Sequence, residues 1–132
     1  MAFSTALSLP VGLMVLIADD DPQIAELWRC FLSRAAPNLS AVTAADGREA
    51  VRLARELQPH VILMDLVMPG LDGLEATKSL KADPETARIP VVAVTGTLYG
   101  TQRVLDAGCD GYMLKPLSAD DLVHGIARVL RC

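Results

Sequence analysis

The sequence predicts an α/β fold: a doubly wound, five-stranded parallel sheet with five helices on its two faces. Apolar runs of strand length alternate along the chain with longer segments of helical periodicity, an alternation typical of parallel sheets. The run Val-Ile-Leu-Met at 61–64 has no polar interruption, which indicates a strand buried on both faces. We expect strands at 11–18, 39–44, 61–65, 89–94 and 111–114.

The first two helices carry clear start signals. Asp21 precedes Pro22, and these residue types favour the N-cap and the first helical position. Asp46 stands three residues before Glu49, which is the spacing of a capping box. A proline soon after each predicted helix marks its end.

The later helices are predicted by the same kinds of signal. The third is expected at about 71–81, with Asp72 and Gly73 at its entry. The fourth is expected at about 101–107. Ser118 should cap the last helix, whose first turn is acidic and whose last turn is basic, an order that complements the helix dipole.

One apolar stripe in the first helix predicts its buried face. Ile24, Leu27, Trp28 and Phe31 recur at helical spacing, so we expect them to face the core. Burial accounts for Trp28 without any ligand.

Composition limits the class of protein. The chain has 132 residues, enough for one domain, and 52% hydrophobic residues, which excludes a disordered chain. The net charge of −4 and the absence of Lys/Arg runs argue against nucleic-acid binding. The three cysteines share no metal-ligand spacing, so we interpret them as reduced thiols of a cytoplasmic protein. Cys30 and Cys109 are expected in the core.

The apolar N-terminus needs an interpretation of its own. We expect residues 1–10 to be a flexible extension and 11–132 to be the folded domain. The first basic residue is Arg29, so the positive region of a signal peptide is missing. The run is also too short to span a bilayer.

Polar residues follow four of the predicted strands. Asp19 and Asp20 come after the first, Asp65 after the third, Thr95 after the fourth and Lys115 after the fifth. Because parallel strands end at one edge of a sheet, these side chains should converge on one cleft.

This set of groups suits phosphoryl chemistry. Clustered carboxylates repel one another unless they are protonated or a cation lies among them. Mg²⁺ prefers oxygen ligands from one or two carboxylates, water and phosphate. A carboxylate can also act as a nucleophile and become an acyl phosphate. An ammonium and a hydroxyl would then stabilise the phosphoryl oxygens.

The chain resembles the receiver domain of bacterial two-component response regulators, of the single-domain chemotaxis-regulator type, over nearly its whole length after about residue 11. Four stretches together are highly specific for this family: Val15-Leu16-Ile17-Ala18-Asp19-Asp20-Asp21, Asp65-Leu66-Val67-Met68-Pro69-Gly70-Leu71-Asp72-Gly73, Val94-Thr95-Gly96 and Gly111-Tyr112-Met113-Leu114-Lys115-Pro116. The resemblance implies the flavodoxin-like strand order 2-1-3-4-5.

The resemblance also implies roles for the polar residues. Asp65 would accept a phosphoryl group from a phosphohistidine of a sensor histidine kinase or histidine phosphotransfer protein. Asp20 and Asp65 would bind Mg²⁺ directly, with the backbone carbonyl of Val67, and Asp19 would act through water. Lys115 would pair with the phosphoryl oxygens. Such a protein is a switch rather than an enzyme, with self-phosphorylation and slow self-dephosphorylation only.

Thr95 and Tyr112 are the switch residues that the resemblance implies. Thr95 would move toward the phosphate and Tyr112 would rotate from an outward to an inward rotamer, which repacks the face of the fourth helix, fifth strand and fifth helix for a downstream protein partner. Val67 and Thr97 stand at positions that tune acyl-phosphate lifetime. The bond before Pro116 is expected to be cis.

The sequence departs from the family in one region. From Thr95 to Gly108 it is about two residues shorter than the common pattern. We therefore predict a short or late-starting fourth helix, and with it an altered output face. We expect no membrane partner and either a monomer or a phosphorylation-dependent dimer.

The sequence leaves one alternative function open and makes two others remote. The chain is expected to be a stand-alone receiver or relay intermediate, and a receiver excised from a hybrid histidine kinase or longer regulator is the alternative that stays open. A phosphatase with an Asp nucleophile is remote, because Val67 interrupts the Asp-x-Asp pattern of haloacid dehalogenases. A flavodoxin-like electron carrier would need a phosphate-binding loop where the acidic residues 19–21 stand.

Overall fold

The strands form a single parallel sheet. The computed structural model of the chain describes residues 9–36, 38–66, 68, 72–95, 101–115 and 118–130. Its strands are β1 (Met14–Ala18), β2 (Ser40–Ala44), β3 (Val61–Asp65), β4 (Val91–Thr95) and β5 (Gly111–Leu114). They lie in the order β2-β1-β3-β4-β5 and every neighbouring pair is parallel. The predicted fold class and strand order are confirmed.

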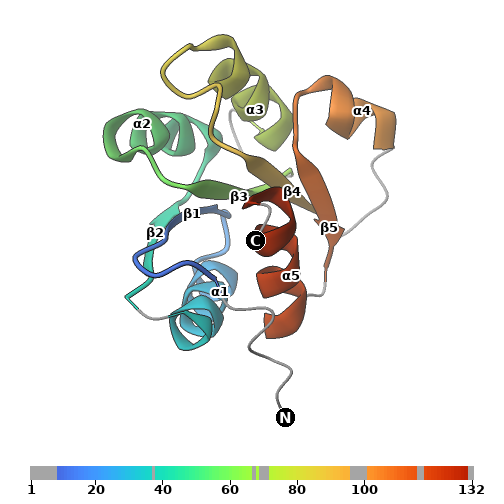
Figure 1. Ribbon diagram of the computed structural model, residues 1–132. Helices are drawn as coiled ribbons and strands as arrows, with labels where there is room; N and C mark the ends of the chain where they lie inside the picture. Colours follow the sequence, from blue (N-terminus) through green and yellow to red (C-terminus); the bar gives the residue numbers. More distant parts are fainter. Residues whose placement is uncertain are drawn as a thin grey trace.

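The helices cover both faces of this sheet. They are α1 (Pro22–Ala35), α2 (Gly47–Leu57), α3 (Gly73–Ala82), α4 (Thr101–Asp106) and α5 (Ala119–Leu130). α1 and α5 lie on one face, and α2, α3 and α4 on the other (Figure 1). None of the helices in the described ranges is long and apolar enough to cross a membrane.

Two apolar clusters, one on each face, hold the sheet in place. Alternate strand residues point to opposite faces, so Leu16 belongs to the cluster under α2 and α3, whereas Val15 and Ile17 belong to the one under α1 and α5. All five residues of β3 and of β4 are buried. Leu9 is buried in the α1/α5 cluster as well, while residues 1–8 of the expected extension lie outside the described residues.

Side-chain caps begin the helices as predicted. Asp21, Asp46 and Asp72 cap α1, α2 and α3, and each side chain accepts a backbone N–H of the first turn at 2.8 or 2.9 Å. Glu49 completes its capping box on the N–H of Ala45, at 2.7 Å, one residue before the cap. These caps fix where each loop at the sheet edge becomes a helix.

Some sequence expectations were wrong in detail. β1 begins at Met14 rather than at residue 11, because residues 11–12 form a turn in which Gly12 has a φ of +75°. Leu27 is 47% exposed and Cys30 is exposed. The buried stripe of α1 runs through Trp28 and Leu32, and a residue one or two positions from Trp28 is turned well away from that stripe.

The short fourth helix is confirmed. α4 has 6 residues, against 12 in α5, and begins six residues after β4 ends. Residues 96–100, which include Leu98 and Tyr99, lie outside the described residues. α4 still contributes Val104 to the core under α3.

The cap of α5 yields a prediction on acid stability. The Ser118 N–H donates to Asp121 Oδ2 at 3.0 Å and the Asp121 N–H donates to Ser118 Oγ at 3.1 Å. These hydrogen bonds hold the pKa of Asp121 below its ordinary value of 3.8, and the hydrogen bond from the Ser118 backbone has the largest effect. A lowered pKa stabilises the folded state above the unfolded pKa, and this contribution is lost as pH falls through the folded pKa.

We therefore expect the free energy of unfolding to fall less steeply below about pH 4 in Asp121→Asn than in wild type. Urea unfolding at a series of acidic pH values would measure this slope. Asp120→Asn is the matched control, because it removes a charge from the same turn and leaves the cap hydrogen bonds in place. Equal slopes for Asp121→Asn and wild type would contradict the prediction.

Candidate functional site

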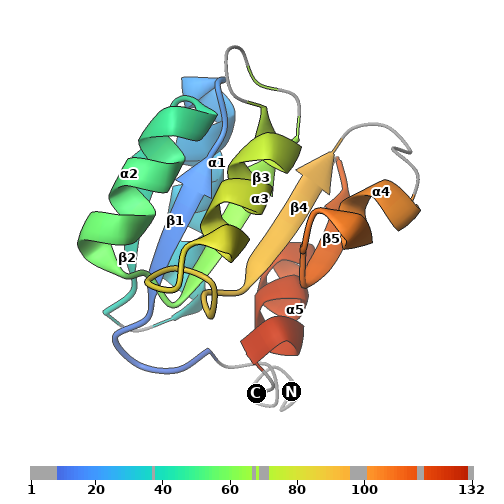
Figure 2. The same ribbon diagram turned by 90° about the horizontal axis from the view of Figure 1, so that it is seen from above.

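The polar residues predicted to converge do meet at one edge of the sheet. Asp19 follows β1, Asp65 ends β3, Thr95 ends β4 and Lys115 follows β5. The strands run side by side with their arrowheads at this edge (Figure 2). Register places Asp65 beside Val94. The edge therefore collects these side chains from four strands on a rigid frame.

Three carboxylates form the acidic part of the site. Asp19, Asp20 and Asp65 each offer an oxygen atom, and these atoms lie within 4.8 Å of one another. Asp19 and Asp65 are buried and Asp20 is exposed. The Asp19 Oδ1 atom accepts the Asp21 N–H at 2.9 Å, which fixes that carboxylate at the mouth of the loop before α1.

Lys115 provides the positive charge of the site. Its Nζ atom lies 3.2 Å from Asp19 Oδ2 and 3.6 Å from Asp65 Oδ2. The Asp19 side chain is 1% exposed, so this ion pair is screened far less than a surface pair. With all groups ionised, three carboxylates and one ammonium leave a net charge of −2 at the site, which one divalent cation would balance.

The donor set fits a hard divalent metal ion. All three side chains offer carboxylate oxygen, and Asp20 is open to solvent, so water could complete the coordination. Mg²⁺ prefers this mixture of one or two carboxylates and several waters. Asp19, Asp20 and Asp65 are therefore the described residues that would hold it.

A hollow in the surface lies beside Asp20. It has a volume of about 400 Å³ and lies between the start of α1 and the end of β2, with Asp20, Ala25, Glu26 and Ala45 among its lining residues. The Asp20 carboxylate therefore borders space that solvent can enter.

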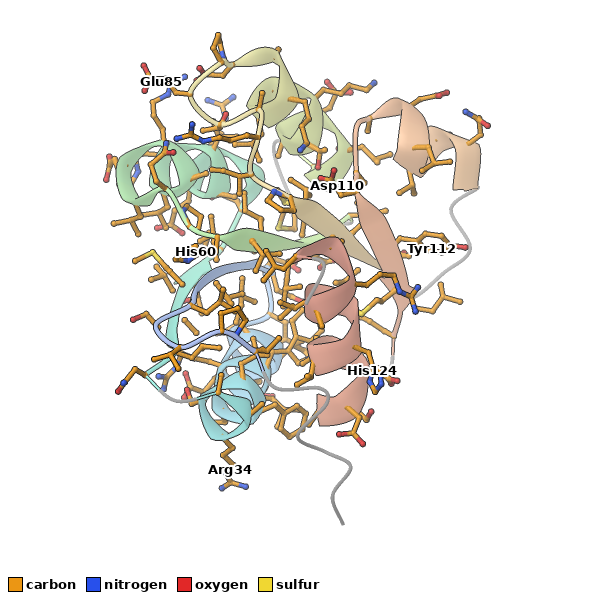
Figure 3. The ribbon with its side chains drawn as sticks, in the orientation of Figure 1. Arg34, His60, Glu85, Asp110, Tyr112 and His124 are labelled. Atoms are coloured by element: carbon orange, nitrogen blue, oxygen red, sulfur yellow. The ribbon has the colours of Figure 1, made fainter. Side chains whose placement is uncertain are left out.

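Thr95 and Tyr112 differ in their surroundings. Thr95 is buried at the end of β4. Its backbone oxygen accepts the Lys115 N–H at 2.7 Å, so a backbone hydrogen bond joins the two residues at the sheet edge. Tyr112 is 42% exposed. Its side chain projects from β5 away from the sheet (Figure 3).

Three residues predicted for the site cannot be placed. Val67, Thr97 and Pro116 lie outside the described residues. The lifetime-tuning positions and the cis bond therefore stay predictions.

The structure also adds two residues to the site that sequence reasoning missed. The Lys115 Nζ atom lies 5.4 Å from the centre of the Trp28 ring, although Trp28 was interpreted only as core. Gly73 sits so close to the end of β3 that a Cβ atom there would collide with the Asp65 backbone oxygen. No local pattern signals either contact, because both depend on how one element packs against another in three dimensions.

Comparison with known proteins agrees on one family. Residues 15–127 match the family model described as response regulator receiver domain. Protein PilH of Pseudomonas aeruginosa is 37% identical over 118 residues, which cover 88% of this chain and 96% of PilH. The polar-differentiation response regulator DivK of Brucella anthropi is also 37% identical over 118 residues, covering 88% of this chain and 94% of DivK.

Solved structures show the same fold. Chemotaxis protein CheY4 of Vibrio cholerae superposes with a TM-score of 0.82 at 28% identity, covering 89% of this chain and 98% of CheY4. The receiver domain of the sensor histidine kinase PA1611 from Pseudomonas aeruginosa superposes with a TM-score of 0.83 at 29% identity. The match covers 92% of this chain and 100% of that receiver. The structure of that receiver has a magnesium ion coordinated in the active site cleft.

Proposed function

We propose that Asp65 is the residue that receives the phosphoryl group in this chain, which belongs to the response regulator receiver family. Receiver domains of this family are phosphoacceptor switches rather than classical enzymes, and they interact with kinases or phosphotransfer proteins and with downstream targets. One observation carries the assignment to Asp65. Its buried carboxylate ends the central strand β3, 3.6 Å from the Lys115 ammonium and beside two further carboxylates.

The proposed reaction is a transfer between two nucleophiles. A carboxylate oxygen of Asp65 attacks the phosphorus of a phosphohistidine, the P–N bond breaks, and its electron pair stays with the imidazole, which takes up a proton. The product is an acyl phosphate on Asp65. Lys115 pairs with one phosphoryl oxygen and the Thr95 hydroxyl donates a hydrogen bond to another.

We further propose Mg²⁺ as the cation of the site, with Asp20 and Asp65 as direct ligands. Bound there, the ion would neutralise charge on the phosphoryl oxygens. Asp19 accepts the Asp21 N–H on one oxygen and the Lys115 ammonium on the other. Both of its oxygens are thus engaged, which favours contact with the ion through water. The Val67 carbonyl as a further ligand stays a prediction.

We propose that phosphorylation of Asp65 changes the packing of the face formed by α4, β5 and α5. An acyl phosphate adds charge and acceptor oxygens beside buried Thr95. The Thr95 backbone is bonded to that of Lys115, so a shift of Thr95 toward the phosphate is transmitted to the end of β5. The exposed Tyr112 stands in the outward position from which it would rotate inward.

We also propose, from the sequence, several further properties of the protein. These are self-phosphorylation with slow self-dephosphorylation, a cytoplasmic location, a downstream protein partner without direct nucleic-acid contact, and a monomer or phosphorylation-dependent dimer. Val67 and Thr97 are proposed to set the acyl-phosphate lifetime.

Metal removal tests the proposed chemistry. Incubation with acetyl phosphate and Mg²⁺ should add one phosphoryl group, detected by intact-mass spectrometry, and a chelator should prevent it because the clustered carboxylates then repel the donor's phosphate. Peptide mapping should place the group on Asp65. Where acetyl phosphate does not react, a phosphorylated histidine domain serves as donor. A group on another residue, or none from either donor, would contradict the proposal.

A further inference from the structure

Lys115 touches an aromatic ring as well as two carboxylates. Its ammonium lies 5.4 Å from the centre of the Trp28 ring, within the range in which a cation is attracted to an aromatic face. Trp28 comes from α1, and Lys115 stands just before α5. These helices contact each other on one face of the sheet (Figure 1), and this arrangement brings two residues far apart in sequence together.

The ring is a fixed partner for a flexible side chain. Trp28 is 3% exposed and packs in the α1/α5 cluster with Leu32, so its orientation is set by the core. The Lys115 side chain has four carbons and considerable rotamer freedom. A desolvated cation–π contact is stronger than an exposed one, and this ring is almost fully buried.

The contact matters most when a metal ion is bound. In the structure Lys115 is held by Asp19 and Asp65, which are also residues of the candidate metal site. A divalent ion bound directly by Asp65 and through water by Asp19 would weaken both of these ion pairs and repel the ammonium. The Trp28 ring carries no group that coordinates such an ion, so its attraction for Lys115 would remain.

We propose that Trp28 is a positioning residue that keeps the Lys115 ammonium over the site, so that it is in place for the phosphoryl group when the carboxylates hold a metal ion. This inference rests on the proposed function for its last step. The contact between the two side chains does not depend on that step and is measured separately.

The first experiment needs no phosphate. The chain has one tryptophan, so intrinsic emission reports the surroundings of Trp28 alone, and a charge beside an indole shifts that emission. Spectra of wild type, Lys115→Met and Lys115→Arg would be compared without metal and with Mg²⁺. We expect the methionine variant to differ from wild type in both conditions, and the arginine variant to lie closer to wild type because a guanidinium also stacks on aromatic rings.

The second experiment measures the initial rate of labelling by acetyl phosphate with Mg²⁺. Trp28→Leu should be slower by roughly three- to tenfold, the size expected for the loss of one cation–π contact. Trp28→Phe keeps an aromatic face and should recover most of the rate. Phe31→Leu is the matched control, because it removes a ring from the same helix and the same cluster, and it should label like wild type. Melting temperatures would show that each variant is folded.

Three outcomes would overturn the inference. The first is an emission spectrum of Lys115→Met equal to that of wild type with Mg²⁺. The second is a normal labelling rate for Trp28→Leu. The third is a loss of rate shared by Trp28→Leu, Trp28→Phe and Phe31→Leu, which would show general packing. If wild type takes up no phosphoryl group at all, the proposed function fails, and the emission spectra still decide whether Trp28 holds Lys115.

Discussion

Replacement of Asp65 by asparagine is expected to abolish phosphorylation. A carboxamide has no anionic oxygen with which to attack phosphorus, so no acyl phosphate can form. Asp65 is buried at the end of β3, and asparagine has nearly the same shape, so the sheet should tolerate the change. Intact-mass spectrometry with acetyl phosphate and Mg²⁺ should find the phosphoryl adduct in wild type and none in the variant.

The same substitution should reveal the metal site through stability. Three carboxylate oxygens within 4.8 Å repel one another, and removal of one charge relieves this, while Lys115 keeps its closer partner Asp19 at 3.2 Å. We therefore expect the melting temperature without metal not to fall. Because a ligand stabilises the state that binds it, Mg²⁺ should raise the melting temperature of wild type more than that of Asp65→Asn.

Asp72→Asn is the matched control for both measurements. Asp72 caps α3 through the Glu75 N–H, lies outside the carboxylate cluster, and asparagine is an equally good N-cap. This variant should be labelled like wild type and respond to Mg²⁺ like wild type. Labelling of Asp65→Asn at the wild-type level would mean that another residue is the acceptor.

The site was predictable because each of its residues follows or ends an apolar strand in the sequence. Asp19, Asp65, Thr95 and Lys115 each stand where an apolar strand ends. Parallel strands end at one edge, so position along the chain was enough to place these residues together. The short α4 was predictable for a related reason, since a shortened segment can hold only a short helix.

The contact between Trp28 and Lys115 was not predictable in this way. The apolar periodicity of α1 indicates that Trp28 is buried, but it does not say against which residue. That depends on where α1 lies on the sheet relative to the end of β5, which Lys115 follows. The errors at Leu27 and Cys30 have a similar origin, because a step of one or two residues turns a helical side chain by 100° or 200°, and only packing decides which direction is buried.

Gly73 is the second residue whose role appears only in three dimensions. The sequence marks it as part of a helix entry. In the structure, α3 starts directly against the end of β3: the Gly73 N–H donates to the Leu66 oxygen at 3.2 Å. A Cβ atom on Gly73 would lie 2.7 Å from Leu66 Cα and would collide with the Asp65 backbone oxygen. These neighbours are backbone atoms, so no side-chain rotation can relieve the overlap.

Gly73→Ala is therefore expected to destabilise the fold by about 3 kcal/mol, near the upper end of the cost of overpacking. For a chain of this length that corresponds to a fall of roughly 10 °C in melting temperature. Urea and thermal unfolding would measure both quantities. The control is Gly111→Ala, where the nearest atom to the new methyl group is a side-chain carbon of Val129 at 3.3 Å, which can move aside. That variant should change stability by less than about 1 kcal/mol.

The same substitution should also slow phosphorylation. Relief of the overlap requires α3 to move away from β3 or the end of β3 to shift. We expect the end of β3 to take part, which displaces the Asp65 backbone relative to Asp19 and Lys115. Labelling by acetyl phosphate, measured well below the melting temperature, should therefore be slower in Gly73→Ala than in Gly111→Ala. If Gly73→Ala lost stability but labelled at the wild-type rate, the strain would be taken up by α3 alone. Asp65 would then be held by the sheet independently of the helix that follows it.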